Sequence, residues 1–138
     1  MKPRYMLDTN ICIYLMKNRP PEVASRFAQC YVGEVVISAV TLAELEYGVT
    51  CSGAKETQNR QALDSLLEDI IPAPFDATAA RSYGPARWST RQRTRDALDK
   101  LIAAHVLALD VTLVTNNEGD FVGYPGLRTE NWAFTRPS

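Results

Sequence analysis

Short apolar runs alternate with longer helical patterns along the whole chain, and this alternation limits the possible folds more than any other feature. The predicted strands are residues 4–8, 35–37, 69–75, 111–115 and 127–130. The predicted helices are residues 10–18, 22–31, from Ser38 or Thr41 to about 48–53, 54–68, from Asp76 or Thr78 to about Trp88, and 96–109. Strands that alternate with helices favour a parallel α/β sheet with helices on both faces. Pro72 and Pro74 place the third strand at an edge of that sheet, because proline cannot donate a ladder hydrogen bond.

The composition is that of one ordinary globular domain. The chain has 138 residues and a net charge of −1, so residues 1–138 are expected to form a single domain, with residues 135–138 as a loose tail. Its three cysteines lack a C-x-x-C spacing, which indicates reduced thiols and an intracellular protein. No apolar run approaches the roughly 20 residues of a membrane span, and no signal peptide precedes the first strand. We therefore expect a cytoplasmic protein that does not bind a membrane.

Four acidic residues stand near the ends of apolar runs, far apart in the sequence: Asp8, Glu44, Asp99 and Asp120. Ligands of open α/β sheets bind outside the carboxyl ends of the strands, where these segments could converge. Carboxylates brought together repel one another unless a cation neutralises them. With no histidine or cysteine cluster nearby, oxygen donors indicate a hard divalent ion, Mg²⁺ or Mn²⁺.

Each acid also has a purely structural interpretation. Asp8, Thr9 or Asn10 could cap a helix, and Asp99 could be a first-turn acid that the helix dipole favours. Glu44 could be a solvated helix residue. Asp120, like the Asn116-Asn117 pair, could serve a turn. The joint pattern is more specific than any single member.

Other catalytic patterns find no support in the sequence. The only histidine, His105, follows Leu98, Leu101 and Ile102 at helical spacing, which favours a hydrogen-bonded core residue. Without a second histidine or a paired nucleophile, a catalytic triad is not indicated. Neither G-x-G-x-x-G nor G-x-x-x-x-G-K occurs, so no glycine-rich phosphate loop is expected.

One basic cluster precedes Asp99. It comprises Arg87, Arg91, Arg93 and Arg95 around Trp88, and Lys100 follows it. Arginines with an interleaved aromatic side chain can clamp phosphates and stack a base. A solvated loop is the alternative, but positive charge beside an acidic metal site suits a polyanionic substrate. We therefore interpret these cations as RNA-binding residues.

Taken together, the segments resemble the PIN-domain ribonucleases, and specifically the VapC toxins of bacterial toxin–antitoxin pairs. The resemblance extends from residue 5 to about residue 132. It rests on M-L-D-T-N at 6–10, S-A-V-T-L-A-E-L-E-Y-G at 38–48, D-K-L-I-A-A-H-V-L-A-L at 99–109, L-V-T-N-N at 113–117, and Asp120-Phe121 followed by Pro125-Gly126-Leu127. Two positions depart from the family pattern. Asn117 stands where many relatives have an acid, and residues 90–98 lack the usual glycine- and proline-containing turn.

The resemblance implies a site and a role. Asp8, Glu44 and Asp99 would hold Mg²⁺ or Mn²⁺, and Asp120 would join them as a catalytic acid. The residues that would orient the metal's outer shell are Thr9, Asn10, Ser38, Thr115, Asn116 and Asn117. The protein would be a homodimeric toxin with a VapB-like antitoxin partner. It would cleave RNA, with tRNA anticodon loops, above all that of initiator tRNA, as targets, and so inhibit translation.

Three other functions remain open from the sequence alone. The first is a nuclease that acts on DNA or on flap structures. The second is an aspartyl-phosphate phosphatase, although Asn10 occupies the position where such enzymes usually carry a second aspartate. The third is an α/β module that binds nucleic acid without cleaving it.

Overall fold

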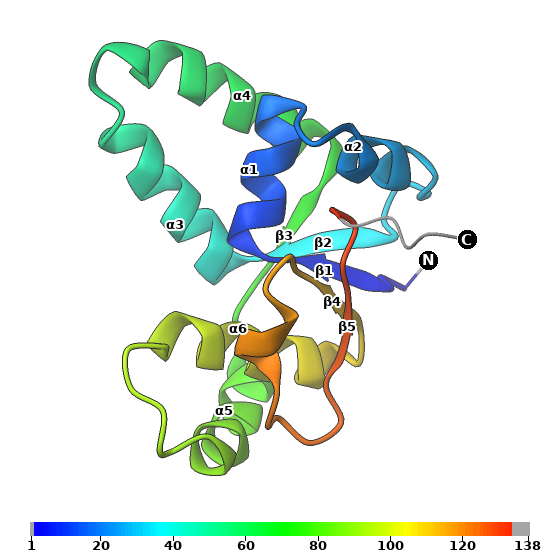
Figure 1. Cartoon of the computed structure of the whole chain (residues 1–138), viewed down its shortest axis with the longest axis vertical. Helices are drawn as coiled ribbons and strands as arrows, with labels where there is room; N and C mark the ends of the chain where they lie inside the picture. The colour runs from blue at the N-terminus through cyan, green and yellow to red at the C-terminus, as the bar shows by residue number, and fades with distance from the viewer. Residues whose placement is uncertain (1, 134–138) are drawn as a thin grey trace.

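A five-stranded parallel sheet lies at the centre of the molecule (Figure 1). The structure is a computed structural model and describes residues 2–133. The strands are β1 (Tyr5–Leu7), β2 (Val35–Ser38), β3 (Ile71–Ala73), β4 (Thr112–Val114) and β5 (Arg128–Glu130). They pair in the order β3-β2-β1-β4-β5, so the proline-containing strand does lie at an edge. The predicted parallel α/β architecture is confirmed.

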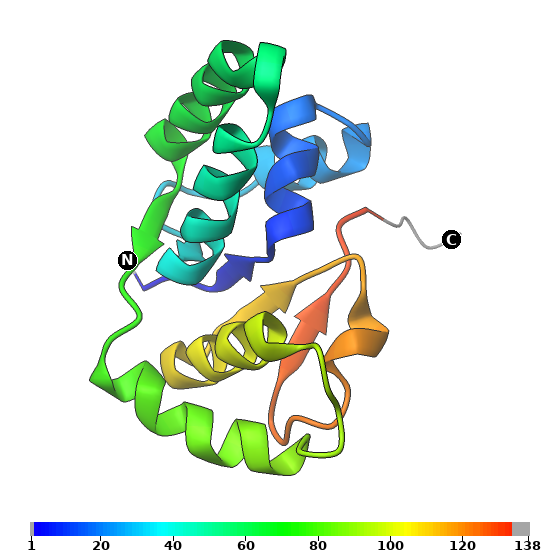
Figure 2. The same ribbon diagram turned by 90° about the vertical axis from the view of Figure 1, so that its left-hand side faces the viewer.

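Helices cover both faces of the sheet. They are α1 (Thr9–Lys17), α2 (Pro21–Ala28), α3 (Ala39–Thr50), α4 (Glu56–Asp69), α5 (Ala77–Ser89) and α6 (Ala97–Leu109), with short 3₁₀ helices η1 (Gly53–Lys55) and η2 (Glu118–Phe121). The first four helices lie on one side of the sheet, and α5 and α6 lie on the other (Figure 2). Within residues 2–133, none of them combines the length and the apolar character needed to span a membrane.

Alternation along β1 divides the core into two layers. Tyr5 and Leu7 face the cluster formed with α1 to α4, whereas Met6 between them packs against α6. Successive side chains of a strand point to opposite faces, so a central strand with helices on both sides must be apolar throughout. This explains why Tyr5, Met6 and Leu7 are all buried.

The strand order changes direction beside β1. The chain moves from β1 outward to β2 and β3, then returns through α5 and α6 to place β4 on the other side of β1. Such a switch point opens a crevice at the carboxyl ends of the two strands involved. Asp8 follows β1 and Thr115 follows β4, so residues from both strands border this crevice.

Two predicted segments differ from the structure. The helix expected to reach residue 31 ends at Ala28, because the chain turns back toward β2 through Gly33, whose φ is +88°. The turn expected at 116–119 continues instead into η2, which buries Phe121 against the α6 layer. The predicted loose tail at 135–138 lies outside the described residues.

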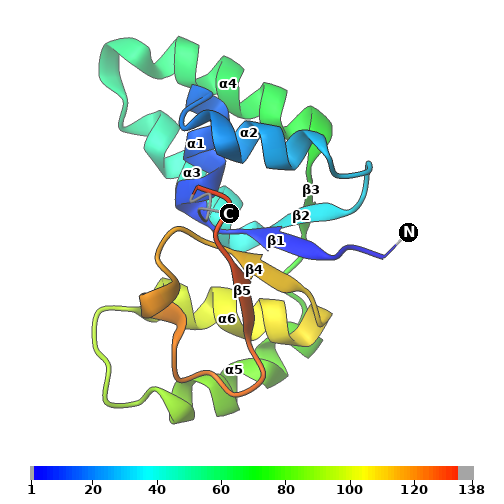
Figure 3. The ribbon, with the colours of Figure 1, turned by 45° about the vertical axis from the view of Figure 1, so that its right-hand side comes forward.

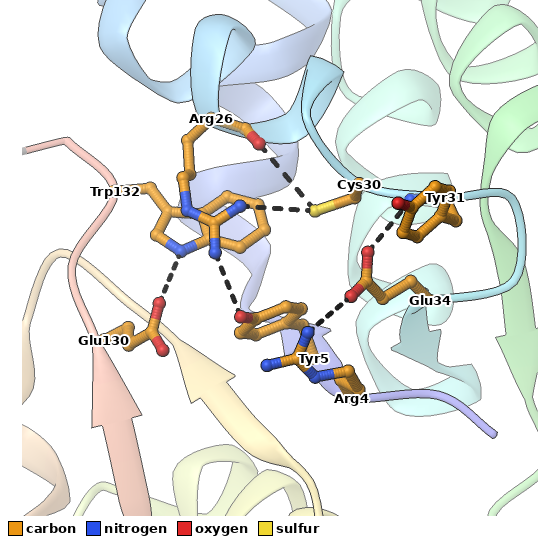
Figure 4. Close-up of polar contacts among 8 residues, drawn as sticks. All are labelled: Arg4, Tyr5, Arg26, Cys30, Tyr31, Glu34, Glu130 and Trp132. Atoms are coloured by element: carbon orange, nitrogen blue, oxygen red, sulfur yellow. Dashed lines mark hydrogen bonds and ion pairs between the residues drawn. The ribbon is translucent and has the colours of Figure 1, made fainter.

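A stacked cluster holds the segment after β5 against the body of the protein (Figure 4). The Arg26 guanidinium on α2 lies 5.3 Å from the Tyr5 ring centroid and 4.9 Å from that of Trp132. Its Nη2 donates to the Tyr5 hydroxyl at 2.9 Å, and Trp132 Nε1 donates to Glu130 at 3.0 Å. Beside it, Glu34 accepts from the Tyr31 amide at 2.9 Å. These contacts tie β5 to α2 and β1.

Candidate active site

Asp8 stands where β1 ends and α1 begins. Its Oδ1 accepts a hydrogen bond from the Ile11 amide at 2.9 Å, so it caps α1. Burial raises the pKa of Asp8 above its ordinary value, and the Glu44 carboxylate raises it further. Hydrogen bonds from the Thr115 hydroxyl and the Ile11 amide act in the opposite direction. Asp8 is therefore a largely desolvated carboxylate in a fixed orientation.

Glu44 comes to the same place from α3. The Thr9 hydroxyl donates to Glu44 Oε1 at 2.8 Å, which links the first turn of α1 to the carboxylate. Thr9 thus orients an acid 35 positions away in the sequence. This is the role predicted for an outer-shell residue.

Asp99 lies in the first turn of α6, on the opposite face of the sheet from α1. Burial raises its pKa to about 6, and the carboxylates of Asp120, Asp96, Asp8 and Glu44 contribute to the rise, in that order. Such a shift is expected where like charges gather without a cation to neutralise them. The acids predicted from sequence are therefore electrostatic neighbours.

A hollow of about 180 Å³ brings these acids together at the carboxyl end of the sheet. It is lined by Asp8, Thr9, Asn10, Glu44, Asp99, Ile102, Asn117, Asp120 and Phe121. We refer to it below as the acidic hollow. Four distant chain segments contribute to it: the end of β1 with the start of α1, α3, α6 and η2. Figure 3 shows β1, α1, α3 and α6 at this end of the sheet.

The two asparagines after β4 have different positions. Asn117 lines the acidic hollow, and its amide donates to the Thr115 hydroxyl at 3.0 Å. The Asn116 side chain instead bonds Tyr14 at 3.1 Å and Asn131 at 2.9 Å. Thr115 is fully buried and also bonds Asp8, so it connects the acid at the end of β1 to Asn117 after β4. Between the two asparagines, the structure favours Asn117 as a site residue.

The donor set of the acidic hollow fits a hard divalent cation. Carboxylate, amide and hydroxyl oxygens line it, and these are the ligands that Mg²⁺ and Mn²⁺ prefer. In the described part of the chain, no group of three or more acidic, histidine or cysteine side chains is placed closely enough to hold a metal ion. The acidic hollow therefore suits a divalent cation through the type of its oxygen donors and through the negative charge gathered there.

Comparison with known proteins agrees with this geometry. The model of the PIN domain family matches residues 5–126. The chain belongs to the PIN-domain family. It is 38% identical over 132 residues to the tRNA(fMet)-specific endonuclease VapC of Shigella flexneri, covering 94% of this chain and 98% of that protein. It is also 39% identical over 131 residues to ribonuclease VapC2 of Rickettsia felis, covering 93% and 97%.

A solved structure shows the same PIN-domain fold. The DNA-bound VapBC complex of Salmonella typhimurium contains a chain that matches with a TM-score of 0.85 and 32% identity. That match covers 94% of this chain and 98% of the other. The VapC relationship proposed from the sequence is thereby confirmed at the level of family and fold.

The predicted RNA-binding cations of this PIN domain make different contacts in the structure. The Arg91 guanidinium lies 4.0 Å from the Trp88 ring centroid, and Arg93 donates to the Asp120 carbonyl at 3.2 Å. Arg87 lies 5.9 Å from the Tyr83 ring centroid. These side chains make contacts within the protein, yet they stay on its surface.

The interpretation of Lys100 as an RNA-binding residue is wrong. Its side chain is only 6% exposed, so it cannot serve as a surface contact for RNA. Its ammonium donates to the carbonyls of Thr90 and Arg93 at 2.9 and 3.1 Å and pairs with Asp96 at 2.8 Å. The error arose because an alternating basic sequence does not reveal which cation folds inward to bind backbone carbonyls.

Ser38 lies outside the acidic hollow. Its hydroxyl caps α3 by accepting from the Val40 amide at 3.0 Å, and it lies 2.8 Å from His105 Nδ1. His105 is buried and also meets the edge of Phe75, which confirms it as a hydrogen-bonded core residue. Ser38 thus supports the packing between α3 and α6 rather than the predicted outer shell of the site.

Asp96 is a site neighbour that the sequence reasoning missed. It precedes α6, pairs with Lys100 and contributes to the raised pKa of Asp99. Its Oδ2 is buried and has no hydrogen-bond partner among the described residues. The sequence signal for this ion pair was its spacing. Asp96 and Lys100 lie four residues apart, on either side of the start of a helix.

Proposed function

We propose that this PIN domain is a divalent-metal-dependent endoribonuclease and the toxin of a type II toxin–antitoxin pair. The acidic hollow carries the proposal, because it gathers acids from four segments at the switch point of the sheet. The ribonuclease names of the VapC relatives support the RNA substrate. When bound, Mg²⁺ or Mn²⁺ would lower the pKa of water and stabilise negative charge on the leaving oxygen.

The side chains of the hollow have distinct roles in this proposal. Asp8, Glu44 and Asp99 would hold the metal, with Asp120 as a further acid. Thr9 and Thr115 would keep two of these carboxylates in position through the hydrogen bonds described above. No side-chain nucleophile is required, since water would attack the phosphodiester.

The proposed partners follow from the solved relatives. Complexes titled VapBC support an antitoxin of the VapB type as the partner of this chain. We also propose a homodimer in the cytoplasm. Co-expression with an antitoxin encoded beside the toxin, followed by co-purification and mass determination, tests both partners.

The proposed substrate is tRNA, cut in the anticodon loop, with initiator tRNA favoured. Relatives from Shigella flexneri and Salmonella typhimurium carry the name tRNA(fMet)-specific endonuclease. Structured RNA is usually recognised through single-stranded loops, and a small domain has little surface for reading a long sequence. Such cleavage would inhibit translation, and Northern blots after induction should show cut tRNA. Intact tRNA with scattered messenger cleavage would contradict the substrate but not the ribonuclease.

Metal-ligand variants test the activity directly. In Asp8→Asn, Glu44→Gln and Asp99→Asn, RNA cleavage with saturating Mg²⁺ should fall by more than the roughly 10–100-fold typical of outer-shell changes. Their free energies of unfolding should stay constant or rise, because mutual repulsion is relieved. Glu68→Gln, on the exposed surface of α4, removes the same charge away from the site and serves as the control.

The readout is sequencing of RNA 5′ ends after brief induction, with purified protein assayed in parallel with and without EDTA. Wild-type cleavage in any of the three variants would remove that residue from the proposed metal site. Cleavage of matched DNA but not RNA oligonucleotides would instead indicate a DNA nuclease. RNA binding without cleavage, with or without metal, would indicate a binding module.

A further inference from the structure

The loop between α5 and α6, residues 90–96, carries three of the cluster's arginines, and we call it the arginine loop. Arg91 binds the Trp88 carbonyl at 2.9 Å and stacks on that residue's ring. Arg93 binds the Asp120 carbonyl and lies over Tyr124. Arg95 has neither a hydrogen bond nor an ion pair with any residue from 2 to 133. Among the three arginines, its guanidinium therefore has the fewest polar contacts with the described residues.

Arg95 also has a distinctive position relative to the acids. It lines two hollows, of about 480 and 380 Å³, that both border Asp99. The larger one also includes Asp120 and Arg93, whereas the smaller one includes Glu44. Arg87 and Arg91 line neither. An extended chain passing Asp99 from one hollow to the other would therefore pass Arg95.

The backbone at Arg95 is unusual for its position. Its φ is +68°, a left-handed conformation that is costly for a residue with a Cβ atom. The other non-glycine residues with positive φ, Asn18 and Asp110, both end helices, where this conformation is routine. Arg95 instead lies one residue before Asp96, the N-cap of α6, so helix capping does not account for it.

The buried Lys100 ammonium anchors the arginine loop from the protein interior. The two carbonyls that it binds belong to Thr90 and Arg93, and its ion pair is with Asp96, so it contacts both ends of the loop. Arg93 extends this support to η2 by its bond to the Asp120 carbonyl. An anchored loop can present one side chain at a fixed place, which is what positioning a substrate requires.

We propose that Arg95 positions the RNA backbone by binding a phosphate next to the scissile one, as the strand crosses the acidic site between the two hollows. This inference rests on the proposed ribonuclease function and adds a specific residue and contact to it. A cation beside the acids would offset their repulsion toward the polyanionic strand. Guanidinium also matches phosphate geometry better than other side chains do.

Two substitutions at Arg95 separate the contact from the conformation. Arg95→Ala removes the guanidinium and keeps the backbone cost, whereas Arg95→Gly removes both. We expect both variants to raise KM about tenfold, the loss of roughly one charge-assisted hydrogen bond, with kcat within about twofold of wild type. Arg95→Gly should also melt at a higher temperature than Arg95→Ala. Arg81→Ala, which removes the same charge on the exposed surface of α5 outside both hollows, should leave KM within about twofold.

A modified RNA identifies the partner of Arg95. The probe is a synthetic oligonucleotide spanning a cleavage site mapped by 5′-end sequencing, with a neutral methylphosphonate and a 2′-deoxy sugar one linkage from that site. Its control carries the deoxy sugar with an ordinary phosphate. The methylphosphonate should weaken binding to Asp8→Asn protein about tenfold, but should change the affinity of Asp8→Asn/Arg95→Ala little, because the two losses concern one contact.

The outcomes separate this inference from the proposed function. If wild type shows no metal-dependent RNA cleavage, both are overturned. If wild type cleaves RNA but the Arg95 variants keep its KM, or Arg81→Ala raises KM equally, the positioning role is overturned while the ribonuclease stands. The positioning role would also be overturned if the methylphosphonate, placed at either linkage next to the cleavage site, weakened RNA binding by Asp8→Asn and by Asp8→Asn/Arg95→Ala to the same extent.

Discussion

At the scale of single residues, structural and chemical roles coincide at the end of the sheet. Asp8 caps α1, which confirms the capping interpretation, and it also lines the acidic hollow, so its role as a metal ligand stays a prediction that its position allows. A carboxylate has about four lone-pair sites, so one cap bond leaves it free to accept others. Asn116, by contrast, is committed to Tyr14 and Asn131 away from the hollow.

Asp120 and Asn117 both line the acidic hollow, but only Asp120 carries the negative charge that a divalent cation favours. We expect Asp120→Asn to weaken Mg²⁺ and Mn²⁺ binding about tenfold or more, and Asn117→Ala to weaken it less. Calorimetric titration of each variant with each metal measures this. The reverse order would show that Asn117, two positions after Thr115, holds the family's fourth ligand position.

His105 provides a probe of the core, because it is the only histidine in the chain. Burial lowers its pKa below the ordinary 6.5, although Asp76 acts in the opposite direction. The unfolded chain therefore binds a proton more readily, so this group's contribution to stability is present above about pH 6.5 and is lost as the pH falls through the folded pKa. NMR titration of the single imidazole should give a value below 6.5.

The stability measurement that accompanies this titration uses Asp99→Asn protein, which removes another group that titrates near pH 6. Its free energy of unfolding should decrease between pH 6.5 and 5, and His105→Gln should reduce that slope. An imidazole pKa at or above 6.5 would contradict the assignment of a neutral core histidine.

At the scale of elements, the α5–α6 hairpin shows why the site could be predicted only in part. The order of strands and helices and the acids at their ends follow from periodicity and polarity, which are local properties. The inward turn of Lys100, the contacts of Arg91 and Arg93, and the early end of α2 depend on loop geometry and packing between distant segments. Periodicity carries no information about these.

Removing the Lys100 ammonium should loosen the arginine loop. In Lys100→Met, trypsin should cut after Arg91, Arg93 or Arg95 about tenfold faster, because opening the loop no longer breaks hydrogen bonds to a charged group. Mass spectrometry of the fragments measures this. Lys17→Met, an exposed lysine at the end of α1, is the matched control.

The double variant Lys100→Met/Asp96→Asn controls for destabilisation of the whole protein, because it leaves no unpaired buried charge. Both variants are first checked for a native circular dichroism spectrum and a cooperative melt. Cleavage in the arginine loop at the wild-type rate in the folded double variant would show that Lys100 does not restrain it.

At the scale of the whole molecule, the acidic site depends on the strand order. β1 lies at the centre of the sheet, between β2 and β4, and its end supplies Asp8. The other acids come from segments that lie at the same edge: Glu44 is on the helix that follows β2, Asp99 is in the first turn of the helix that leads into β4, and Asp120 is in η2 after β4. The sequence predicted this convergence correctly, since it follows from parallel pairing alone.

The pairing of β1 with β4 has a consequence for biosynthesis. Tyr5 to Leu7 are synthesised well before their partners on one side, Thr112 to Val114. At about 5–20 residues per second, this order imposes a lag of roughly 5–20 s before the central ladder can close. Asp8 is made before Asp120, so no nascent fragment that stops short of Asp120 possesses the complete set of acids. A translating cell would therefore meet the cleaving activity only after Asp120 has been made, which leaves that interval for an inhibitor to accumulate.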